Sequence, residues 1–471
     1  MNSQSTLGLK YNTYDTYRDS GVSNLGQTPL HWKVMQLKRT INGCVNGIWG
    51  AEPKTNSEDT IVLRVADFDR PKLSLKDDGF TYRNISDGEK LSRKLKSGDL
   101  LLEKSGGGER TLVGQVVLFD KAFEAVTSNF VAKMTPISGF NSGFLNYVFS
   151  RFYNENINYC SIKQNTGIQN LDSAAYLAEK FAFPLEKEQE KIANFLDHET
   201  AKIDTLIDKQ QQLIKLLKEK RQAVISHAVT KGLNSDAPMR ESGVEWLGEV
   251  PENWNIWKFG HFAPIITCGI ASTPTYVEEE EGMPFLSAQN IQNNKLSLHK
   301  YNYISNELHN QLTQYRKPER GDVLLTRVGA GIGAACVIDI DMEFSIYVSL
   351  THIRIKPELA CNKFIVYFFA SDYCQYLNHQ GTVTGGGVGN LNVQNVIKYS
   401  VALPSIEEQK KIVCYLDSIS GKYNELIVTS LRAIELARER RTALISAAVT
   451  GKIDVRNWTA PVSSNNNKEV A

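Results

Sequence analysis

The glycine-rich run from Gly329 to Ala334 has the spacing of a nucleotide-binding loop. Its pattern, G-x-G-x-x-A after a strand-like segment, matches the dinucleotide fingerprint, in which a following helix turns its N-terminus toward the pyrophosphate. The residues that follow, Ala335 to Asp339, read as a strand, and a related glycine-rich run at Ser105 to Gly114 lacks the spacing. We therefore predict a hairpin between two strands and no cofactor loop.

The residue sets that other catalytic chemistry requires do not stand out. The sequence has no Walker lysine loop, no Asn/Asp-Pro-Pro-aromatic tetrapeptide of the kind that amino-methyltransferases use, and no evident pair of acidic residues followed by a lysine as in nucleases. Seven cysteines are scattered without a C-x-x-C pair, and the eight histidines add no ligand spacing beside them. Neither a zinc site nor a disulfide framework is expected. The pattern favours a binding protein over an enzyme, with no catalytic residue, no metal and no cofactor on this chain.

Polar side chains at several turns could instead contact nucleic acid. Amide, hydroxyl, lysine and arginine groups carry the donors and acceptors that read base edges. Taken singly, each of these residues is better explained as a turn residue, and only as a set are they candidates for DNA contact. The set comprises Arg64, Asp67, Lys104, Ser105, Arg110, Lys163, Gln164, Asn165 and Asn170 in the first half of the chain, and Gln289, Asn290, Arg327, Thr382, Thr384, Asn390 and Asn392 in the second.

Net charge does not decide the question, because 53 Lys and Arg residues against 52 Asp and Glu residues give +1. Phosphate binding depends on local clusters rather than on the total. Most of the clusters are those expected of solvated surfaces, although the last two match each other within a long repeated segment. The clusters are Lys90, Arg93, Lys94 and Lys96; Arg316, Lys317 and Arg320; Lys215, Lys218, Lys220 and Arg221; and Arg432, Arg438, Arg440 and Arg441.

The elements that must position these residues occur twice. The segment Pro184 to Thr230 matches Pro404 to Thr450 at a constant offset (404 − 184 = 220), and 20 of the 47 aligned positions are identical. Such self-similarity identifies a duplicated element. Earlier in each half, a turn-rich motif with Ser-Gly-Val, Leu-Gly, Pro and Trp also repeats, as RDSGVSNLGQTPLHW at 18–32 and RESGVEWLGEVPENW at 240–254. We predict a structural role for this Trp motif, whose apolar residues could clamp onto a neighbouring element.

Residues 33–183 and 255–403 are two diverged copies of one module. Short strands are predicted at 61–66, 98–102 and 115–119, each bounded by Gly, Asp or Asn. Two modules that share a plan but differ in sequence are typical of one task performed on different targets. The matched runs are LRVADF (63–68) with LSAQNI (286–291), GDLLLEKSG (98–106) with GDVLLTRVG (321–329), both at an offset of 223, and FLNYVFSRFY (144–153) with FIVYFFASDY (364–373) at 220.

Each long repeated segment is predicted to be one helix, which would span roughly 65 to 70 Å. Ser405 is expected to cap the amide of Glu408 while the glutamate side chain reaches back, whereas Leu185 leaves the first copy only its acidic first turn. Gln210 and Ser430 interrupt the apolar seam at the same place, which would fix the register of a paired coil. The predicted seam comprises Leu196, Ile203, Leu206, Leu213, Leu217 and Val224, answered by Leu416, Tyr423, Leu426, Ala433, Ala437 and Leu444.

The repeat is circular. The linker after the first long helix has no full equivalent after the second, and the N-terminal segment 17–32 supplies the missing part, so we expect the chain ends to lie near each other. No segment suits a signal peptide or a membrane span, and a cytoplasmic location is expected. We divide the chain into a polar tail (1–16), a first module (17–183), a first long helix (184–232), a second module (233–403), a second long helix (404–452) and a C-terminal tail (453–471) expected to be disordered at its end.

Four stretches resemble the specificity subunit of a type I restriction-modification enzyme, and the likeness runs from about Arg18 to Asp454. They are SGVEWLGEVPENW, GDVLLTRVGAGIGAACVID, LNVQNVIKYSVALPSIEEQKKIVCYLD and RERRTALISAAVTGKID. The motif Pro-x-x-x-Glu-Gln-x-x-Ile at the start of the long helix, present at Pro184 and again at Pro404, is a quite specific sign of likeness to this family. The departures are Leu185 at the first cap and WGAEPK in place of the usual Gly-Thr-Pro turn that STPTY keeps in the second module.

The resemblance implies an α+β protein with two globular target-recognition domains of mixed α/β structure, separated by two long helices that form an antiparallel coiled coil with pseudo-two-fold symmetry. It implies that each domain reads one half of a split double-stranded DNA target and that the helices set the spacer. Two modification (methyltransferase) subunits would dock on the assembly, and restriction (motor-nuclease) subunits would join for cleavage. S-adenosylmethionine for adenine N6 methylation, and ATP with Mg²⁺, are then expected on the partner subunits, while this chain catalyses nothing.

The alternative from a different class is a coiled-coil scaffold that assembles other subunits without reading DNA sequence. The two hypotheses differ in how DNA binding responds to salt. A DNA reader should lose affinity steeply as salt rises and still keep its preference among sequences.

Overall fold

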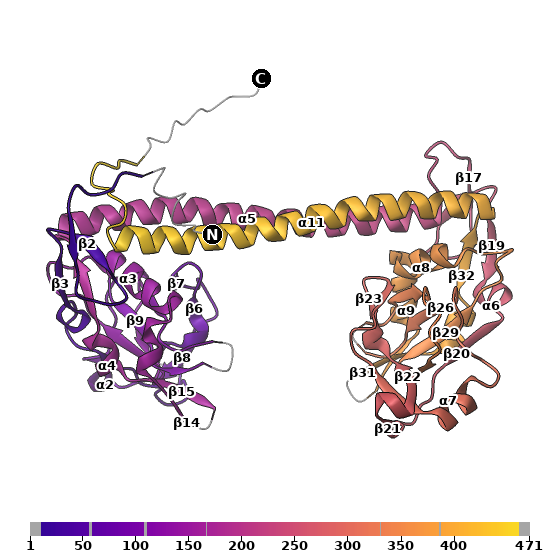
Figure 1. Cartoon of the computed structure of the whole chain (residues 1–471), viewed down its shortest axis with the longest axis horizontal. Helices are drawn as coiled ribbons and strands as arrows, with labels where there is room; N and C mark the ends of the chain where they lie inside the picture. The colour runs from indigo at the N-terminus through magenta and orange to yellow at the C-terminus, as the bar shows by residue number, and fades with distance from the viewer. Residues whose placement is uncertain are drawn as a thin grey trace. The chain divides into compact units, whose positions relative to one another are not determined.

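A computed structural model describes residues 11–55, 59–107, 111–165, 167–329, 331–385 and 388–460. The chain divides into two compact units, the first built from residues 1–210 and 432–471 and the second from residues 211–431. The long helices α5 (Glu186–Lys231) and α11 (Ile406–Val449) each contribute one end to each unit (Figure 1), and their predicted ranges are confirmed to within a few residues. No helix in the described ranges combines the length and the apolar character needed to cross a membrane.

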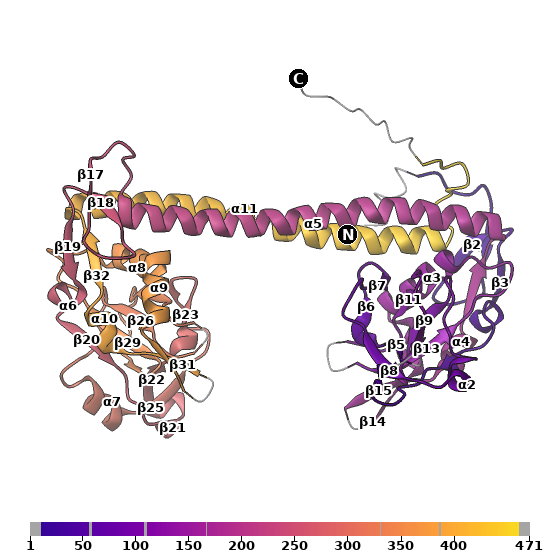
Figure 2. The same cartoon turned by 180° about the vertical axis from the view of Figure 1, so that it is seen from behind.

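The first unit is built from short strands in several small sheets (Figures 1 and 2). Strand β5 (Asp59–Leu63) pairs in parallel with β12 (Ala125–Thr127) and antiparallel with β8 (Thr81–Asn84). The sheets have the orders β11 (Val116–Leu118), β9 (Leu100–Glu103), β13 (Val131–Met134), β4 (Val45–Asn46); β12 (Ala125–Thr127), β5 (Asp59–Leu63), β8 (Thr81–Asn84); and β10 (Ser105–Gly106), β15 (Ile168–Leu171), β14 (Ile162–Asn165). The strand pairs are β1 (Tyr17–Asp19) with β2 (Gln27–Pro29), β3 (Lys33–Gln36) with β16 (Lys180–Phe183), and β6 (Phe68–Asp69) with β7 (Ser74–Leu75).

The second unit repeats the order of the four-stranded sheet and the parallel pair, here β28 (Ser345–Ile346) with β22 (Gly282–Leu286). Its second sheet has the additional strand β21 (Tyr276–Val277), and β30 and β31 form a two-stranded sheet in the described residues where the first unit has three strands. Its sheets are β27 (Ala335–Val337), β26 (Val323–Thr326), β29 (Leu350–Arg354), β20 (Ile265–Cys268); β28 (Ser345–Ile346), β22 (Gly282–Leu286), β25 (Asn302–Ser305), β21 (Tyr276–Val277); and β30 (Thr382–Gly385) with β31 (Val388–Leu391). The strand pairs are β17 (Met239–Glu241) with β18 (Glu249–Pro251), β19 (Asn255–Lys258) with β32 (Ser400–Leu403), and β23 (Ile291–Gln292) with β24 (Lys295–Leu296). The modules therefore share one topology although their sequences have diverged.

Each unit packs one apolar helix between its sheets and the long helices (Figure 1). In the first unit this is α3 (Ser142–Asn154), and the Tyr147 hydroxyl donates to Asp197 of α5 at 2.8 Å. In the second it is α8 (Asn362–Ala370), and the Tyr367 hydroxyl donates to Asp417 of α11 at 2.7 Å. These matched contacts join each module to its long helix. The other α-helices of the described residues are α2 (Asp87–Lys90), α4 (Ser173–Ala178), α6 (Phe259–Phe262), α7 (Asn306–Thr313), α9 (Asp372–Gln380) and α10 (Val393–Ile397).

The Trp motif fixes the start of each long helix, as its predicted structural role requires. The indole of Trp32 donates to Glu188 at 3.0 Å, and the indole of Trp254 donates to Glu408 at 3.0 Å. Both tryptophans are fully buried. The shared Glu of the helix-start motif therefore serves as the acceptor for the shared Trp.

The helix cap agrees only in part with prediction. Ser405 accepts the amide of Glu408 at 3.2 Å, as expected. The expected return of the Glu408 carboxylate to the start of the helix is wrong, because Trp254 and Asn253 both donate to that carboxylate. The adjacent Gln409 accepts the amide of Cys361 at 2.7 Å and donates to the carbonyl of Pro404 at 2.9 Å, so it ties the start of α11 to the loop before α8.

The long helices bury the same face at matched positions. The packed positions follow the alternating three- and four-residue spacing of a heptad. The predicted seam is wrong at Leu206, Leu213 and Leu426, which are 48%, 42% and 51% exposed, because the isoleucine that follows each of them is turned inward instead. The buried and half-buried positions that follow this spacing are Leu196, Thr200, Ile203, Ile207, Gln210, Ile214, Leu217, Arg221, Val224 and Ala228 in α5, and their counterparts at the repeat offset of 220 in α11.

The N-terminal half of each long helix lies beside the C-terminal half of the other, so the helices run antiparallel within each unit. An equivalent polar contact joins them in both units. In the first unit, Arg441 Nε lies 3.0 Å from Asp204 Oδ1. In the second, Arg221 donates to Asn424 Oδ1 at 2.6 Å. Asp204 and Asn424 are equivalent positions of the repeat, as are Arg221 and Arg441, so the two units contain the same contact with an ion pair in one and an amide acceptor in the other.

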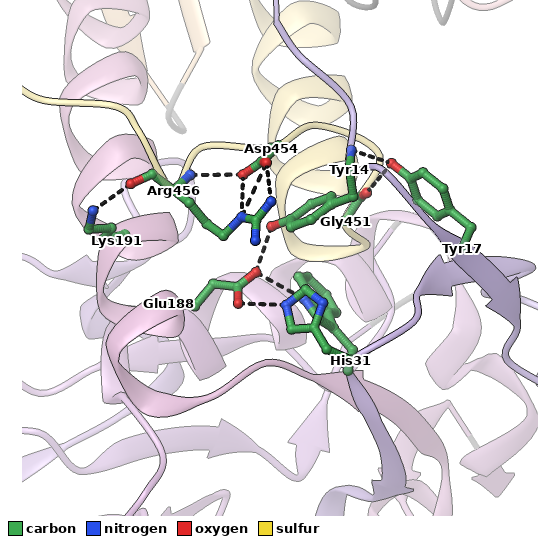
Figure 3. Close-up of polar contacts among 9 residues, drawn as sticks. Tyr14, Tyr17, His31, Glu188, Lys191, Gly451, Asp454 and Arg456 are labelled. Carbon is green, nitrogen blue, oxygen red and sulfur yellow. Dashed lines mark hydrogen bonds and ion pairs between the residues drawn. The ribbon is translucent and has the colours of Figure 1, made fainter.

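The described segments nearest to the two chain ends meet within the first unit, in keeping with the circular repeat (Figure 3). Tyr17 donates its hydroxyl proton to the carbonyl of Gly451 at 2.9 Å, and the amide of Asp454 donates to the carbonyl of Asn12 at 2.7 Å. The N-terminal and C-terminal segments therefore lie side by side at the start of α5.

Candidate nucleic-acid interface

The candidate residues of the first unit gather on the ladder β10-β15-β14. Ser105 pairs with Asn170 across one strand boundary, and Asn170 pairs with Lys163 across the next. The Ser105 hydroxyl lies 2.6 Å from Asn170 Oδ1, and Lys163 forms an ion pair with Asp172 at 2.8 Å. Three segments that are far apart in sequence thus place a hydroxyl, an amide and an exposed ammonium group in one row.

The same row exists in the second unit with different side chains. Asn390 pairs with Val383 in β30 and forms an isolated bridge with Val328. Arg327 donates to Asn390 Oδ1 at 2.7 Å and to the carbonyl of Leu391 at 3.0 Å. Asn390 thus occupies the place of Asn170, while the flanking serine and lysine of the first unit are replaced by two valines.

Lys104 lies beside Arg93, a member of one of the basic clusters expected at a solvated surface. Lys104 donates to Asn46 Oδ1 at 2.8 Å, and Arg93 donates to the carbonyl of the same Asn46 at 3.3 Å. Asn46 ends the sheet in strand β4. Arg316, which matches Arg93 at the offset of 223, donates to Thr267 at 2.7 Å, and Thr267 lies in β20, the strand that corresponds to β4.

The neighbouring lysines of these two basic clusters also match. Lys94 forms an ion pair with Glu124, and Lys317, its counterpart at the same offset, forms one with Glu343. The Lys94 carbonyl accepts a hydrogen bond from Lys133, as the Lys317 carbonyl does from Arg354. The basic clusters at 93–94 and 316–317 are therefore one structural feature present twice, a relation that their shared offset of 223 could have shown in the sequence.

Two of the candidate residues, Asp67 and Asn290, are buried turn residues. Asp67 is 3% exposed and accepts the amide of Arg64 at 2.7 Å, while Asn290 is 1% exposed and accepts the amide of Ser287 at 2.9 Å. Because their side chains close a short 3-10 turn, the structure gives Asp67 and Asn290 a structural role and does not bring them to the ladder surface. The same turn ends strand β5 at Leu63, short of the predicted Ala66.

The remaining candidates are placed as follows. Asn392 accepts the amide of Gln394 and caps α10, and Thr382 donates to the carbonyl of Asn378. Gln164, in β14, and Gln289 are exposed. Arg110 lies outside the described residues, as do the side chains of Asn165 and Thr384, whose backbones lie in β14 and β30.

Sequence reasoning missed one buried ion pair at the base of the first glycine-rich run. Arg70, in the turn after β6, lies 2.8 Å from Glu103 Oε1 and donates to the Tyr153 hydroxyl at 3.2 Å. The Tyr153 hydroxyl in turn donates to the carbonyl of Leu112 at 3.0 Å. Burial raises the pKa of the Glu103 carboxyl, although Arg70 opposes the shift. No sequence motif marks this pair, because its partners lie far apart in the sequence, one in an irregular turn and the other at the end of a strand.

The glycine-rich run that suggested a nucleotide loop is the predicted hairpin, since β26 pairs antiparallel with β27 on either side of it. Within the described residues, no group of three or more His, Cys, Asp or Glu side chains is gathered as a metal site would require. All seven cysteines are free thiols.

Comparison with known proteins places the chain in a family. Residues 70–216 and 251–436 match the type I restriction modification DNA specificity domain. A Haemophilus influenzae protein described as a putative type I restriction enzyme specificity subunit is 28% identical over 139 residues, which are 29% of this chain and 34% of that protein. The matched stretch thus spans about a third of that relative's length.

Two solved structures share the fold. One, from a study of complex assembly and conformational transition of the type I R-M system, superposes with a TM-score of 0.64 at 16% identity and covers 90% of this chain and 98% of the other. The other, the crystal structure of the HsdS subunit from Thermoanaerobacter tengcongensis, gives a TM-score of 0.51 at 16% identity, with 90% and 98% covered. Since the two matched ranges together make up more than half of the sequence, the chain belongs to the family of type I restriction-modification DNA specificity proteins.

Proposed function

We propose that this chain is the sequence-reading subunit of a type I restriction-modification complex and that each unit reads one half of a bipartite double-stranded DNA target. The observation that carries the proposal is the division of each module into a common part and a variable part. The common part includes Arg93 and Arg316, two arginines at matched positions that donate to the corresponding strands β4 and β20. The variable part is the row of Ser105, Asn170 and Lys163 in the first unit and of Val328, Asn390 and Val383 in the second, which differ in charge and hydrogen-bonding groups.

This division is the one that DNA recognition needs. Contacts to phosphates fix the protein on the duplex and carry no sequence information, whereas contacts to base edges carry it. Matched cations suit the phosphates, which every sequence presents alike. Rows that differ, with Ser105 and Lys163 in one unit and Val328 and Val383 in the other, suit two different half-sites.

The long helices carry exposed leucines at matched positions, which suits docking of two like partners. Leu206 and Leu426 are 48% and 51% exposed, and Leu216 and Leu436 are 60% and 54% exposed. Each pair is separated by the repeat offset of 220. We assign these positions to the docking of two modification subunits, with restriction subunits joining a larger complex. Catalysis, and binding of S-adenosylmethionine, ATP and Mg²⁺, belong to those partners in this proposal, and the complex would act in the cytoplasm.

Exchange of one module tests the proposal. Residues 33–183 are replaced by the corresponding module of another family member, and the DNA selected by the chain with its modification subunit is sequenced before and after the exchange. One half of the target should change and the other half should stay as it was. A change in both halves, or in neither, would contradict the assignment of one half-site to each module. Reciprocal exchange of residues 255–403 is the matched control and should change the other half.

A further inference from the structure

The ion pair of Arg70 and Glu103 is peculiar to the first unit. The position that corresponds to Glu103 at the end of the strand is Thr326, and the corresponding hairpin turn holds Asn293 and Asn294. Both partners are therefore absent together from the second unit, which keeps the order of the four-stranded sheet, β27-β26-β29-β20, without them. The shared scaffold does not require the pair.

The pair is also costly for the unit that has it. The Glu103 side chain is 0% exposed, and removal of a carboxylate from water carries a large desolvation cost that one partially exposed partner does not repay in full. A buried ion pair is thus weak as a source of stability, and its presence in one copy alone calls for a role in which the two copies differ. Recognition of two different half-sites is such a role.

The geometry holds the guanidinium group in one orientation. Glu103 accepts from one terminal nitrogen of Arg70 and Tyr153 accepts from the other, and the Arg70 Cζ atom lies 5.9 Å from the centre of the Tyr153 ring. These contacts engage two of the five N–H donors of an arginine. The Arg70 side chain keeps 29% of its surface exposed. A fixed, partly exposed guanidinium group is the arrangement that presents a planar donor pair to an acceptor pair.

The array lies next to the ladder surface. A Cβ atom at Gly106, in β10, would lie 3.5 Å from Glu103 Oε1, and the Leu112 carbonyl that Tyr153 binds stands on the other side of the glycine-rich run. Ser105, which begins the row with Asn170, is the residue before Gly106. Arg70 is therefore held at the base of the run that carries the candidate DNA contacts.

We propose that Arg70 is a specificity-determining residue of the first unit, which reads a guanine in its half-site through the O6 and N7 acceptors, and that Glu103 and Tyr153 are its positioning residues. The proposal rests on the proposed function, since it assigns one base contact within it. Arginine bidentate to guanine is the commonest specific contact in the major groove. The second unit, with Thr326 and an Asn-Asn turn, would read its own half-site by other groups.

The key variant is Arg70→Lys. Lysine keeps a cation beside the buried Glu103 carboxylate, so a merely structural role would be preserved, whereas the planar fork that reads guanine is lost. The full-length chain, assembled with its modification subunit, is offered a pool of randomised duplex DNA, and the bound fraction is sequenced. The double variant Arg70→Asn/Glu103→Thr copies residues of the second unit and serves as a second test that leaves no buried carboxylate unpaired. Arg151→Lys, which makes the same change at the ion pair of the buried Arg151 with Glu155 in the same unit, is the control.

We expect both Arg70 variants to lose the preference for guanine at one position of one half-site by roughly 5- to 150-fold, the range for one bidentate base contact. The other half-site should be unchanged, and Arg151→Lys should select the wild-type sequence. If Arg70→Lys selects the wild-type sequence at every position, the inference is overturned and the pair is structural, whatever the double variant does. If the wild-type chain itself selects no bipartite sequence, the proposed function fails, which is a separate outcome from failure of the arginine assignment.

Discussion

Removal of the matched arginines should weaken DNA binding without altering sequence preference. Arg93 and Arg316 are anchored on corresponding strands, through Asn46 in one unit and Thr267 in the other. If each contacts one phosphate, the double variant Arg93→Gln/Arg316→Gln loses two phosphate contacts. The slope of log affinity against log salt should then fall in magnitude by about 1.8, since each phosphate contributes about 0.9.

This slope predicts a salt-dependent loss of affinity. Between about 50 and 200 mM salt, the affinity of the wild-type chain should decrease about tenfold more than that of the double variant. Fluorescence anisotropy with a selected duplex and with a scrambled duplex, across a salt series, measures both slopes. The ratio of the two affinities should stay constant, and the free energy of unfolding should change by no more than about 0.5 kcal/mol, because these side chains lie at the surface.

The reasoning would be refuted by an unchanged salt slope, which would place both arginines away from the phosphates. It would also be refuted by a loss of preference for the selected duplex at unchanged slope, which would make them base readers. The single variants Arg93→Gln and Arg316→Gln should each produce about half of the change in slope, and a change confined to one of them would contradict the matched role.

Three further predictions concern the second unit and the long helices. Burial alone would raise the pKa of Asp322, but hydrogen bonds from His352 at 2.7 Å and Arg354 at 2.8 Å outweigh it and hold the pKa at about 2. The stabilisation by ionised Asp322 is present above the unfolded pKa of about 3.9 and is lost as pH falls through about 2. The variant Asp322→Asn should therefore lower the free energy of unfolding by about 2 kcal/mol at pH 7. Chemical denaturation should show that this difference between wild type and variant vanishes between about pH 4 and pH 2. The variant Leu216→Glu/Leu436→Glu should abolish co-purification of the modification subunit while thermal unfolding is unchanged, and retained co-purification would remove these leucines from the docking surface. Insertion of one heptad at the midpoint of both long helices should change the spacer of the selected DNA and neither half-site, and an unchanged spacer would show that the helices do not set it.

The duplicated plan could be predicted from the sequence, because identical residues at a constant offset mark equivalent places. The offset of 223 correctly joined the strand that ends at Glu103 to the strand that ends at Thr326, and the constant offset of 220 matched the two long helices. The circular repeat also predicted the proximity that the structure shows between the segments at 12–17 and 451–454.

Side-chain direction along the long helices could not be predicted as well. An apolar residue stands on either side of the seam at several turns, so Leu206 and Ile207 fit the pattern about equally, and the packing of the partner helix decides which of them is buried. The Glu408 carboxylate was assigned to the helix cap for a similar reason. Its bond to Trp254 joins residues 154 positions apart, a separation that local pattern rules do not address.

The sequence grouped some of the candidate residues that the structure brings together. The polar residues of the first ladder come together although they lie in three distant segments, which supports the grouping by turns. The ion pair of Arg70 and Glu103 could not be predicted, because nothing in the sequence around either residue indicates the other as its partner. Asp67 and Asn290 show the converse, since an Asp or Asn that closes a short turn has the same sequence signature as an exposed polar contact.

The recognition of a split target can be measured by selecting randomised duplex DNA with the wild-type chain and its modification subunit. We expect two short specified sequences separated by a constant number of unspecified base pairs, with the first half altered by exchange of residues 33–183 alone. Selection of one undivided sequence, or binding that discriminates among no sequences at any salt concentration, would contradict this expectation.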